Sequence, residues 1–457
     1  MVVNADVLVA DLRTTFNRGR TKPVTWRVEQ LRALNRLLKQ ESAVLERALG
    51  ADLGKSPAEV ATTETGFVAN EIDHALRNLN TWLRPERSKV PAFMLPAKAR
   101  VVREPLGVTL IIGAWNYPVQ LTLAPLVGAL AGGNCAIVKP SELSERTAAA
   151  LARLLPKYLD PEAVKVVKGG VPETTALLEQ RFDHIFFTGS APVGVIVMTA
   201  AARHLTPVTL ELGGKNPCIV EPGVDLAVTA RRIVWGKFLN AGQTCVAPDY
   251  LLAVGQSATE LESHLANAIR EMYGPDPATS PDYGRIVSER HFDRVAAFLR
   301  DGRVVTGGQA DRGNRYIAPT VLAEVDPGAP VMREEIFGPV LPIIAVPDLS
   351  SAITFVNERD KPLSLYAFTA SEQSRRRLLA ETSSGAVGFG LPAAHLAVPG
   401  LPFGGVGTSG QGAYHGKYSI DTFTHAKAVL DKPLSPDTWR LAYPPVGRLK
   451  ERMLRFL

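Results

Sequence analysis

The sequence feature that most constrains the fold is a stretch of 34 residues, 105–138, without a single charged side chain. Turn-forming residues interrupt it at Asn116–Pro118 and again at Gly132–Asn134, so no unbroken segment is long enough to span a membrane. The stretch therefore predicts a buried strand, a loop, a buried helix and a second buried strand. Strands that are apolar on both faces are typical of parallel sheets that helices cover on both sides.

Strand-like and helix-like patterns alternate along most of the chain. In the first half, strands are expected at 107–113, 135–140, 163–169 and 184–189, with a helix at about 145–159. After residue 212, a second series predicts strands at 217–221, 251–255 and 340–346 and helices at about 259–273 and 289–300. The first eighty residues are mostly amphipathic helix, whereas the proline-rich segment after Pro85 is expected to be an extended arm. This alternation predicts an α/β chain with two doubly wound, Rossmann-like parallel sheets.

Length and composition exclude several classes of protein. A chain of 457 residues is too long for one ordinary domain, and its 46% hydrophobic and 21% charged residues exclude disorder. The net charge of +6 comes without a basic run interleaved with aromatic residues, which argues against nucleic-acid binding. The three cysteines lie far apart and without histidines at ligand spacing, so neither a disulfide framework nor a metal site is expected. The reducing cytoplasm is the expected location.

The C-terminal residues 439–457 combine five arginines and lysines with apolar side chains. A basic amphipathic helix there can lie on an anionic membrane surface, or it can dock on its own protein or on a partner subunit. Docking is the commoner outcome for such tails and is expected here, so peripheral membrane contact is the lesser alternative.

Cys245 lies in the run GKFLNAGQTCVAP, residues 236–248, among small and polar neighbours. A cysteine in this setting is placed as a nucleophile would be, rather than as a core residue. The alternative stays open at this point, because free cysteine is often buried and unreactive.

One junction of strand and helix has the features of a phosphate site. An apolar strand runs into Thr188, Gly189 and Ser190, and a helix is expected to start near Pro192, with Ser190 suited to the N-cap. The unpaired N–H groups and the positive dipole end of such a helix can hold a phosphate, although ordinary strand-to-helix turns also use glycine and serine. Gly405, Gly407 and Gly410 match the spacing GxGxxG, but no strand precedes them, so they do not predict a dinucleotide site.

Four further polar residues stand at the ends of expected strands or turns. Lys139 and Glu142 follow a buried strand at the edge where open α/β sheets bind ligands, and they either contact ribose hydroxyls or form a surface ion pair. Glu211 lies between two leucines, so burial should raise the pKa of its carboxyl and suit it to general base catalysis, unless it faces outward. Asn116 either donates an N–H to an oxyanion or caps its own turn.

Taken together, these motifs resemble an aldehyde dehydrogenase over essentially the whole chain. The short N-terminus, the run FLNAGQTCVAPDY and the ending GAYHGKYSIDTF are similar to the class 3 branch, which includes fatty and aromatic aldehyde dehydrogenases. Seven motifs occur in the family's order: WNYP with Asn116, KPSE with Lys139 and Glu142, FTGS with Gly189 and Ser190, ELGGKNP with Glu211, GQTC with Cys245, EEIFGP with Glu335 and Phe337, and PFGG with Phe403.

The resemblance implies NAD(P)-dependent oxidation of a medium- or long-chain aliphatic or an aromatic aldehyde to the carboxylic acid. Cys245 would form a thiohemiacetal and then a thioester, Asn116 would hold the oxyanion, and Glu211 would activate the water that opens the thioester. The cofactor residues would be Lys139, Glu142 and Glu335 on ribose hydroxyls, Gly189 and Ser190 at the pyrophosphate, and Phe337 beside the nicotinamide. Carboxylates on ribose hydroxyls favour NAD, although class 3 relatives often accept NADP as well.

The resemblance also implies an organisation of the chain into a homodimer of three-part subunits. The implied parts are a cofactor domain of residues 1–80 and 104–211, a catalytic domain of 212–400, a bridging arm of 81–103 with 401–430, and a basic tail of 431–457. Tyr117, Trp235 and Phe389 are candidates for an apolar aldehyde channel, with ordinary core packing as the alternative.

One segment departs from the family pattern. Residues 386–400, AVGFGLPAAHLAVPG, stand where relatives commonly have a VND-like segment, which leaves the substrate preference open.

Two rival functions are possible. Acylating relatives, which transfer the acyl group to coenzyme A, typically lack the glutamate at the Glu211 position, so hydrolysis is expected. A binding protein without activity on the same fold should have lost Cys245, Asn116 or Glu211, and all three are present.

Overall fold

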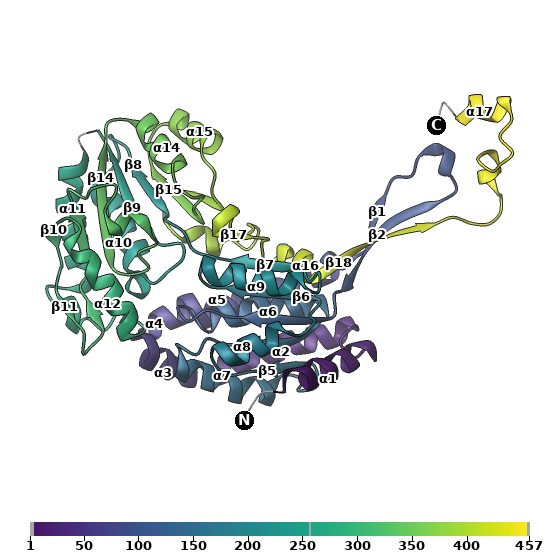
Figure 1. Cartoon of the computed structure of the whole chain (residues 1–457), viewed down its shortest axis with the longest axis horizontal. Helices are drawn as coiled ribbons and strands as arrows, with labels where there is room; N and C mark the ends of the chain where they lie inside the picture. Colours follow the sequence, from purple (N-terminus) through teal and green to yellow (C-terminus); the bar gives the residue numbers. More distant parts are fainter. Residues whose placement is uncertain (1–3, 256, 455–457) are drawn as a thin grey trace.

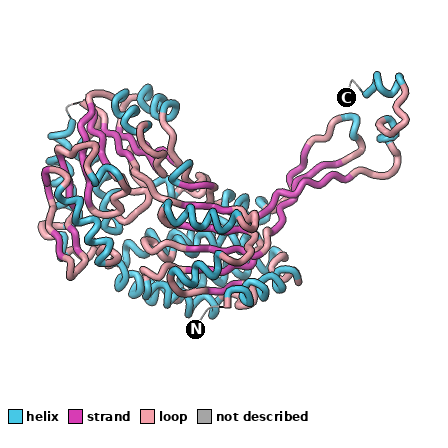
Figure 2. The backbone as a smooth tube through the Cα atoms, viewed as in Figure 1, coloured by secondary structure: helices cyan, strands magenta, loops and turns pink. Residues whose placement is uncertain are grey.

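The uncharged stretch forms the elements that its sequence predicts, in a computed structural model that describes residues 4–255 and 257–454 (Figures 1 and 2). It folds into strand β3 (Val108–Ile112), a loop, helix α6 (Gln120–Gly132) and strand β4 (Cys135–Lys139). Every residue of α6 is buried. A helix that is apolar on all sides must be surrounded by other elements, and α6 accordingly lies at the centre of its layer.

The first sheet has six strands in the order β17-β7-β6-β3-β4-β5, and only the short β17 runs antiparallel to its neighbour. The remaining strands are β17 (Gly410–Gln411), β7 (Val208–Glu211), β6 (His184–Thr188) and β5 (Val164–Val166). One face is covered by α1 (Ala5–Asn17), α8 (Val171–Leu178) and α9 (Ala191–Ala202). The other is covered by α2 (Val24–Gln40), α3 (Ser42–Leu53), α5 (Gly66–Trp82), α6, α7 (Glu145–Tyr158) and α16 (Lys417–Phe423), with the short α4 (Pro57–Val60) beside them.

The second sheet has seven strands in the order β10-β13-β14-β9-β8-β15-β16, with β10 alone antiparallel to its neighbour. Its strands are β10 (Arg303–Thr306), β13 (Thr320–Ala323), β14 (Val340–Val346), β9 (Tyr250–Val254), β8 (Pro217–Val220), β15 (Ser364–Phe368) and β16 (Ala386–Phe389). Its helices are α10 (Leu226–Phe238), α11 (Ser257–Tyr273), α12 (Glu289–Ala297), α13 (Pro330–Arg333), α14 (Leu349–Asn357) and α15 (Glu372–Glu381), and a small hairpin joins β11 (Ala310–Asp311) to β12 (Tyr316–Ile317). The prediction of two mostly parallel, helix-covered sheets is therefore confirmed.

A narrow arm projects from the body of the molecule (Figure 1). Its strands are β1 (Glu86–Ser88), β2 (Lys98–Pro105) and β18 (Thr424–Asp431), all antiparallel. Of the expected bridging segment 401–430, only β18 joins this arm. The glycine-rich part pairs with β7 through β17, and α16 packs against α6, because these apolar residues are buried in the core of the first sheet.

The C-terminal tail is not one continuous amphipathic helix. A 3-10 turn at Thr438–Leu441 and the short helix α17 (Arg448–Leu454) are separated by Pro444 and Pro445, which cannot continue a helix. The tail docks on the tip of the arm, where the Trp439 ring lies 6.1 Å from that of Phe93. Residues 455–457 lie outside the described part. None of the described helices is both long enough and apolar enough to cross a membrane.

Candidate active site

Cys245 lies in the loop between α10 and β9, and a left-handed turn brings it there. Asn240 and Ala241 both have φ of 51°, and Gly242 has φ of 74°. A Cβ atom on Gly242 would lie 2.3 Å from the carbonyl oxygen of Gly338, so only glycine allows this close approach to the EEIFGP segment. After the turn, the Asn216 amide donates to the carbonyls of Cys245 (2.7 Å) and Ala247 (3.0 Å), which holds the loop against the second sheet.

The environment of the Cys245 thiol favours its protonated form. Burial, followed by the carboxylates of Glu335 and Glu211, raises the pKa of Cys245 to about 12. The backbone N–H groups of Cys245 and Val246 oppose this rise in pKa by hydrogen bonding to the sulfur. The side chain is half-buried and forms no disulfide. Since the thiolate is the nucleophile, the site needs a further positive charge or a base to produce it.

Asn116 is held close to the Cys245 loop by a contact between the first and second halves of the chain. Its amide donates one N–H to the carbonyl of Gln243 at 3.0 Å, two residues before Cys245. An amide group has two N–H donors, so the second stays available to an oxyanion. The neighbouring Tyr117 hydroxyl lies 2.7 Å from the Thr244 hydroxyl. The turn of WNYP and the turn of GQTC are thus joined at two points.

A fully buried ion pair supports this arrangement from the helical segment 1–80. The Lys55 ammonium lies 2.7 Å from Glu64 and also donates to the carbonyl of Asn116 at 2.8 Å. The second oxygen of Glu64 accepts the N–H groups of Val119 and Gln120 at the start of α6. Neither Lys55 nor Glu64 was predicted from the sequence. A lysine beside a glycine is typical of a surface, and only long-range packing pairs it with Glu64.

Glu211 stands at the end of β7, and it is buried rather than outward-facing. Glu211 is only 2% exposed, and neither of its carboxylate oxygens has a hydrogen-bond partner among the residues that the structure describes. Burial raises the pKa of Glu211 well above its ordinary value. One glycine of the GxGxxG-like run contributes here. Gly410 on β17 pairs with Glu211, and a Cβ atom at Gly410 would lie 2.4 Å from the carbonyl oxygen of Leu210.

Glu335 reaches the same region through a gap left by a glycine. A Cβ on Gly213, two residues after Glu211, would lie 2.0 Å from a carboxylate oxygen of Glu335. Burial, and then the Asp249 carboxylate, raises the pKa of Glu335 to about 8. Phe337 has a strained φ of 47° and packs edge-on against Trp115, with ring centroids 5.2 Å apart.

The remaining candidates for cofactor binding lie at the ends of strands of the first sheet. Lys139 ends β4 as a buried lysine and forms an ion pair with Glu142 at 2.8 Å. The Gly189 N–H donates to the Glu211 carbonyl at 3.0 Å. Ser190 occupies the N-cap position of α9 as predicted, but its hydroxyl makes no capping hydrogen bond. The exposed end of α9 therefore offers its own N–H groups and a hydroxyl that does not cap them.

Of the three channel candidates, Tyr117 alone has a described hydrogen-bond contact beside Cys245, through Thr244. Trp235 is 41% exposed on α10. Phe389 is half-buried on β16, where the Arg375 guanidinium lies 5.3 Å from its ring centroid. The channel thus stays a prediction.

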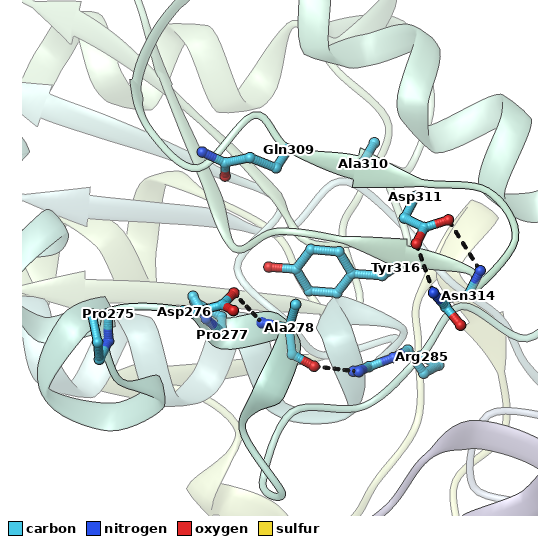
Figure 3. Close-up of a pocket in the computed structure, with 10 residues that line it drawn as sticks. All are labelled: Pro275, Asp276, Pro277, Ala278, Arg285, Gln309, Ala310, Asp311, Asn314 and Tyr316. Carbon is cyan, nitrogen blue, oxygen red and sulfur yellow. Dashed lines mark hydrogen bonds between the residues drawn. The ribbon is translucent and has the colours of Figure 1, made fainter.

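A cavity of about 430 Å³ lies away from all of these residues (Figure 3). It is formed by the loop around Asp276 and the β11–β12 hairpin. Its charged groups already have partners, since Asp311 accepts from Asn314 and Arg285 donates to the carbonyl of Ala278 (Figure 3). None of the motif residues lines it, so we assign no chemistry to this cavity.

The chain has clear similarity to known proteins. The model of the aldehyde dehydrogenase family matches residues 3–429. Aldehyde dehydrogenase family 3 member A2 of Rattus norvegicus is 49% identical over 449 residues, covering 98% of this chain and 93% of that protein. The dimeric NADP-preferring aldehyde dehydrogenase of Mus musculus is 48% identical, covering 97% of this chain and 98% of its own. The substrate-bound structure of Staphylococcus aureus AldH superimposes with a TM-score of 0.96 at 42% identity, covering 99% of both chains.

Proposed function

The chain belongs to the aldehyde dehydrogenase family as an NAD(P)-dependent enzyme, and we propose that it oxidises its aldehyde to a carboxylic acid through a thioester on Cys245. The observation that carries the proposal is the hydrogen bond from the Asn116 amide to the Gln243 carbonyl at 3.0 Å. This single contact holds an uncharged N–H donor beside the nucleophile's loop. Glu211, buried without a partner among the described residues, supplies the base.

The first step is addition, because a hydride cannot leave a planar aldehyde carbon without forming an acylium ion. The Cys245 thiolate attacks the carbonyl carbon, a C–S bond forms, and the carbonyl electron pair moves to the oxygen. The second N–H of Asn116 and the backbone N–H of Cys245 stabilise that oxyanion. Because burial keeps the pKa of Cys245 high, its proton must leave as the thiol attacks, to a water molecule or to Glu211, and must pass on to solvent so that Glu211 is again a carboxylate for the later hydrolysis.

The thioester is opened by water. NAD(P), held by the residues assigned below, would supply the hydride acceptor that lets the tetrahedral adduct on Cys245 become a thioester. Glu211 removes a proton from a water molecule as the water oxygen attacks the thioester carbon. The C–S bond then breaks, the carboxylic acid leaves, and the thiolate is regenerated. The raised pKa of Glu211 makes its carboxylate a stronger base than an exposed glutamate.

The residues present fit a dinucleotide. The Ser190 hydroxyl, which does not cap α9, and the N-terminus of that helix suit a pyrophosphate, and the Glu335 carboxylate lies against Gly213, two residues after Glu211. We assign ribose contacts to Lys139, Glu142 and Glu335, and the nicotinamide side to Phe337. Carboxylates at the ribose favour NAD, whereas the 48% identical relative is named NADP-preferring, so we propose NAD with NADP also accepted.

For the whole molecule we propose the organisation that follows from these assignments. Residues 1–80 and 104–211 would bind the cofactor, 212–400 would carry the nucleophile, 81–103 and 401–430 would be the bridging segments, and 431–457 the basic tail. The substrate of the enzyme is a medium- or long-chain aliphatic or an aromatic aldehyde. We assign Tyr117, Trp235 and Phe389 to the channel that admits this substrate. A homodimer fits the relative named dimeric. The three cysteines, none of which forms a disulfide in the described chain, fit a cytoplasmic location.

The test is NADH formation with a graded series of straight-chain and aromatic aldehydes, with Cys245→Ser and Glu211→Gln as variants. Wild type should turn over, Cys245→Ser should not, and Glu211→Gln should give one burst of NADH followed by turnover about 100- to 10,000-fold slower. Unchanged steady-state turnover in Glu211→Gln would exclude it as the base. Acceleration by coenzyme A with release of an acyl-CoA would favour the acylating alternative.

A further inference from the structure

Several buried polar groups on one face of the first sheet have no hydrogen-bond partner among the described residues. They include the Tyr414 hydroxyl, both carboxylate oxygens of Glu211 and the Thr188 hydroxyl. Tyr414 is 1% exposed, Glu211 2% and Thr188 8%. A buried polar group without a partner is costly, so such groups are rare except where a small polar molecule satisfies them. Their gathering around Glu211 therefore indicates a site for such a molecule.

The strand register places these groups on the same face. Thr188 on β6 pairs with Glu211 on β7, and Phe186 pairs with Thr209. Residues two apart on a strand share a face, so all four side chains point to the same side of the sheet. The Tyr414 ring packs edge-on against Phe186, with ring centroids 4.9 Å apart. Tyr414 thus lies over the same face of β6 and β7 as the Glu211 carboxylate.

Backbone contacts hold Tyr414 in this position. The N–H of Phe403 donates to the carbonyl of Tyr414 at 3.0 Å, and the N–H of Tyr414 donates to the carbonyl of Phe403 at 2.8 Å. A Cβ atom at Gly412 would lie 3.0 Å from the Thr209 hydroxyl, so this segment runs close over β7. The Tyr414 hydroxyl itself is not needed to hold the side chain in place.

The Tyr414 hydroxyl lies within electrostatic reach of the assigned base and nucleophile. Burial, and after it the charges of Glu211 and then Cys245, raises the pKa of this hydroxyl well above its ordinary value, so the phenol stays neutral. Tyr414 and Glu211 are not hydrogen-bonded to each other. One water molecule between them would give both groups the partner that each needs.

We propose that Tyr414 is a positioning residue for hydrolysis, which holds, together with Glu211, the water molecule that opens the thioester. The inference rests on the proposed function and deepens it. The Glu211 carboxylate accepts one O–H of this water and the Tyr414 oxygen accepts the other, so a lone pair of the water oxygen faces the thioester.

Tyr414 takes no part in the proton transfer itself. As the water oxygen bonds to the carbonyl carbon, the water proton that faces Glu211 passes to its carboxylate. The C–S bond then breaks, and its electron pair returns to the sulfur of Cys245. The neutral phenol neither gains nor loses a proton in this step, and it acts by fixing the direction of attack.

The test separates formation of the thioester from its hydrolysis. Tyr414→Phe removes the hydroxyl and keeps the ring that packs on Phe186. Tyr283→Phe is the matched control, since Tyr283 is buried in the core of the second sheet and its hydroxyl donates to the carbonyl of Ile317 at 2.8 Å. Stopped-flow absorbance of NADH would follow thioester formation, and intact-mass spectrometry of quenched samples would follow the decay of the acyl-enzyme.

In Tyr414→Phe we expect the NADH burst and kcat/KM to match wild type, while the acyl-enzyme decays about 10- to 100-fold more slowly, because a misplaced water attacks less often. Hydroxylamine, a stronger nucleophile than water, should release the acyl group equally fast from both proteins when it is added after the burst. The melting temperature should not fall, because the lost hydroxyl has no partner in the described chain. Tyr283→Phe should show the opposite pattern, a lower melting temperature with wild-type decay.

Decay of the acyl-enzyme at the wild-type rate in Tyr414→Phe would overturn the inference. A slower NADH burst would also overturn it, because the hydroxyl would then act before the thioester forms. Absence of any acyl-enzyme on Cys245 of the wild type would instead count against the proposed function itself.

Discussion

Asn116 is placed by a carbonyl that lies 127 residues further along the chain, that of Gln243. Glu211 is placed by burial, and Cys245 by a left-handed turn that Gly242 allows. Asparagine, glutamate and cysteine are common residue types. The hydrogen bonds, burial and backbone turns around these three give them the properties that the proposed chemistry needs. Removal of one uncharged donor or a shift in one pKa should therefore have a defined kinetic effect.

Replacing Asn116 with alanine should lower kcat by about 100- to 1,000-fold, as loss of one oxyanion donor does in other enzymes. The KM for aldehyde should change much less, because the interaction forms in the transition state. Steady-state kinetics with one good aldehyde would measure both constants. Asn116→Asp is the matched control, since it keeps the shape but replaces the donor with an acceptor, and it should be at least as slow. A rise in KM with kcat preserved would contradict the assignment.

The raised pKa of Cys245, about 12, predicts how its reactivity depends on pH. Since only the thiolate reacts, the rate of alkylation by iodoacetamide should rise steadily through the alkaline range, without a plateau near neutrality. Addition of NAD should shift the curve to lower pH, because a positive ring favours the thiolate. Mass spectrometry of the modified peptide would identify the site, and Cys245→Ser is the control. A plateau near neutral pH without NAD would show that the thiol is already activated.

At the scale of elements, the active site depends on contacts between segments that the chain order keeps apart. The Lys55–Glu64 pair joins the helical segment 1–80 to the WNYP turn and to the start of α6. Gly242 lets the GQTC turn touch the EEIFGP segment, and β17 closes the first sheet beside Glu211. Each of these contacts positions the loop or strand of a residue to which we assign a catalytic role.

Replacing Lys55 with methionine should destabilise the protein by about 3–5 kcal/mol, because the Glu64 carboxylate would stay buried without its counter-charge. Urea denaturation would measure the loss. The double variant Lys55→Met with Glu64→Gln should recover part of it, since glutamine is neutral and still accepts the N–H groups of Val119 and Gln120. If both variants were equally unstable, the charge of Glu64 would not be the cause.

At the scale of the whole molecule, two helix-covered sheets carry the chemistry, and the arm projects beyond them (Figure 1). The tail after β18 folds back on the tip of that arm, where Lys432 donates to the Thr438 hydroxyl and to the carbonyl of Met94. The described contacts of the tail thus lie far from Cys245 in the fold.

A chain that ends at Asp431 should keep its turnover and fold, because β18 is still present and pairs with β2 along its length. Steady-state kinetics and thermal unfolding would test this, and liposome flotation of both chains should recover equal amounts. A chain that ends before Thr424 is the control, since it loses β18 and should lose the arm. Loss of activity on removal of 432–457 alone would assign the tail a part in catalysis.

The sequence by itself determined the class of fold and the family motifs, and it predicts which residues serve as nucleophile, base and oxyanion donor. Those conclusions depend on local patterns: apolar runs without charge, strand and helix periodicity, and motifs in a fixed order. The tertiary structure decided that Glu211 is buried rather than outward-facing, that residues 410–423 belong to the first sheet, and that the proline-broken tail docks on the arm. It also revealed the buried Lys55–Glu64 pair. Burial and pairing are properties of residues far apart in sequence that meet in space, so no local pattern contains them.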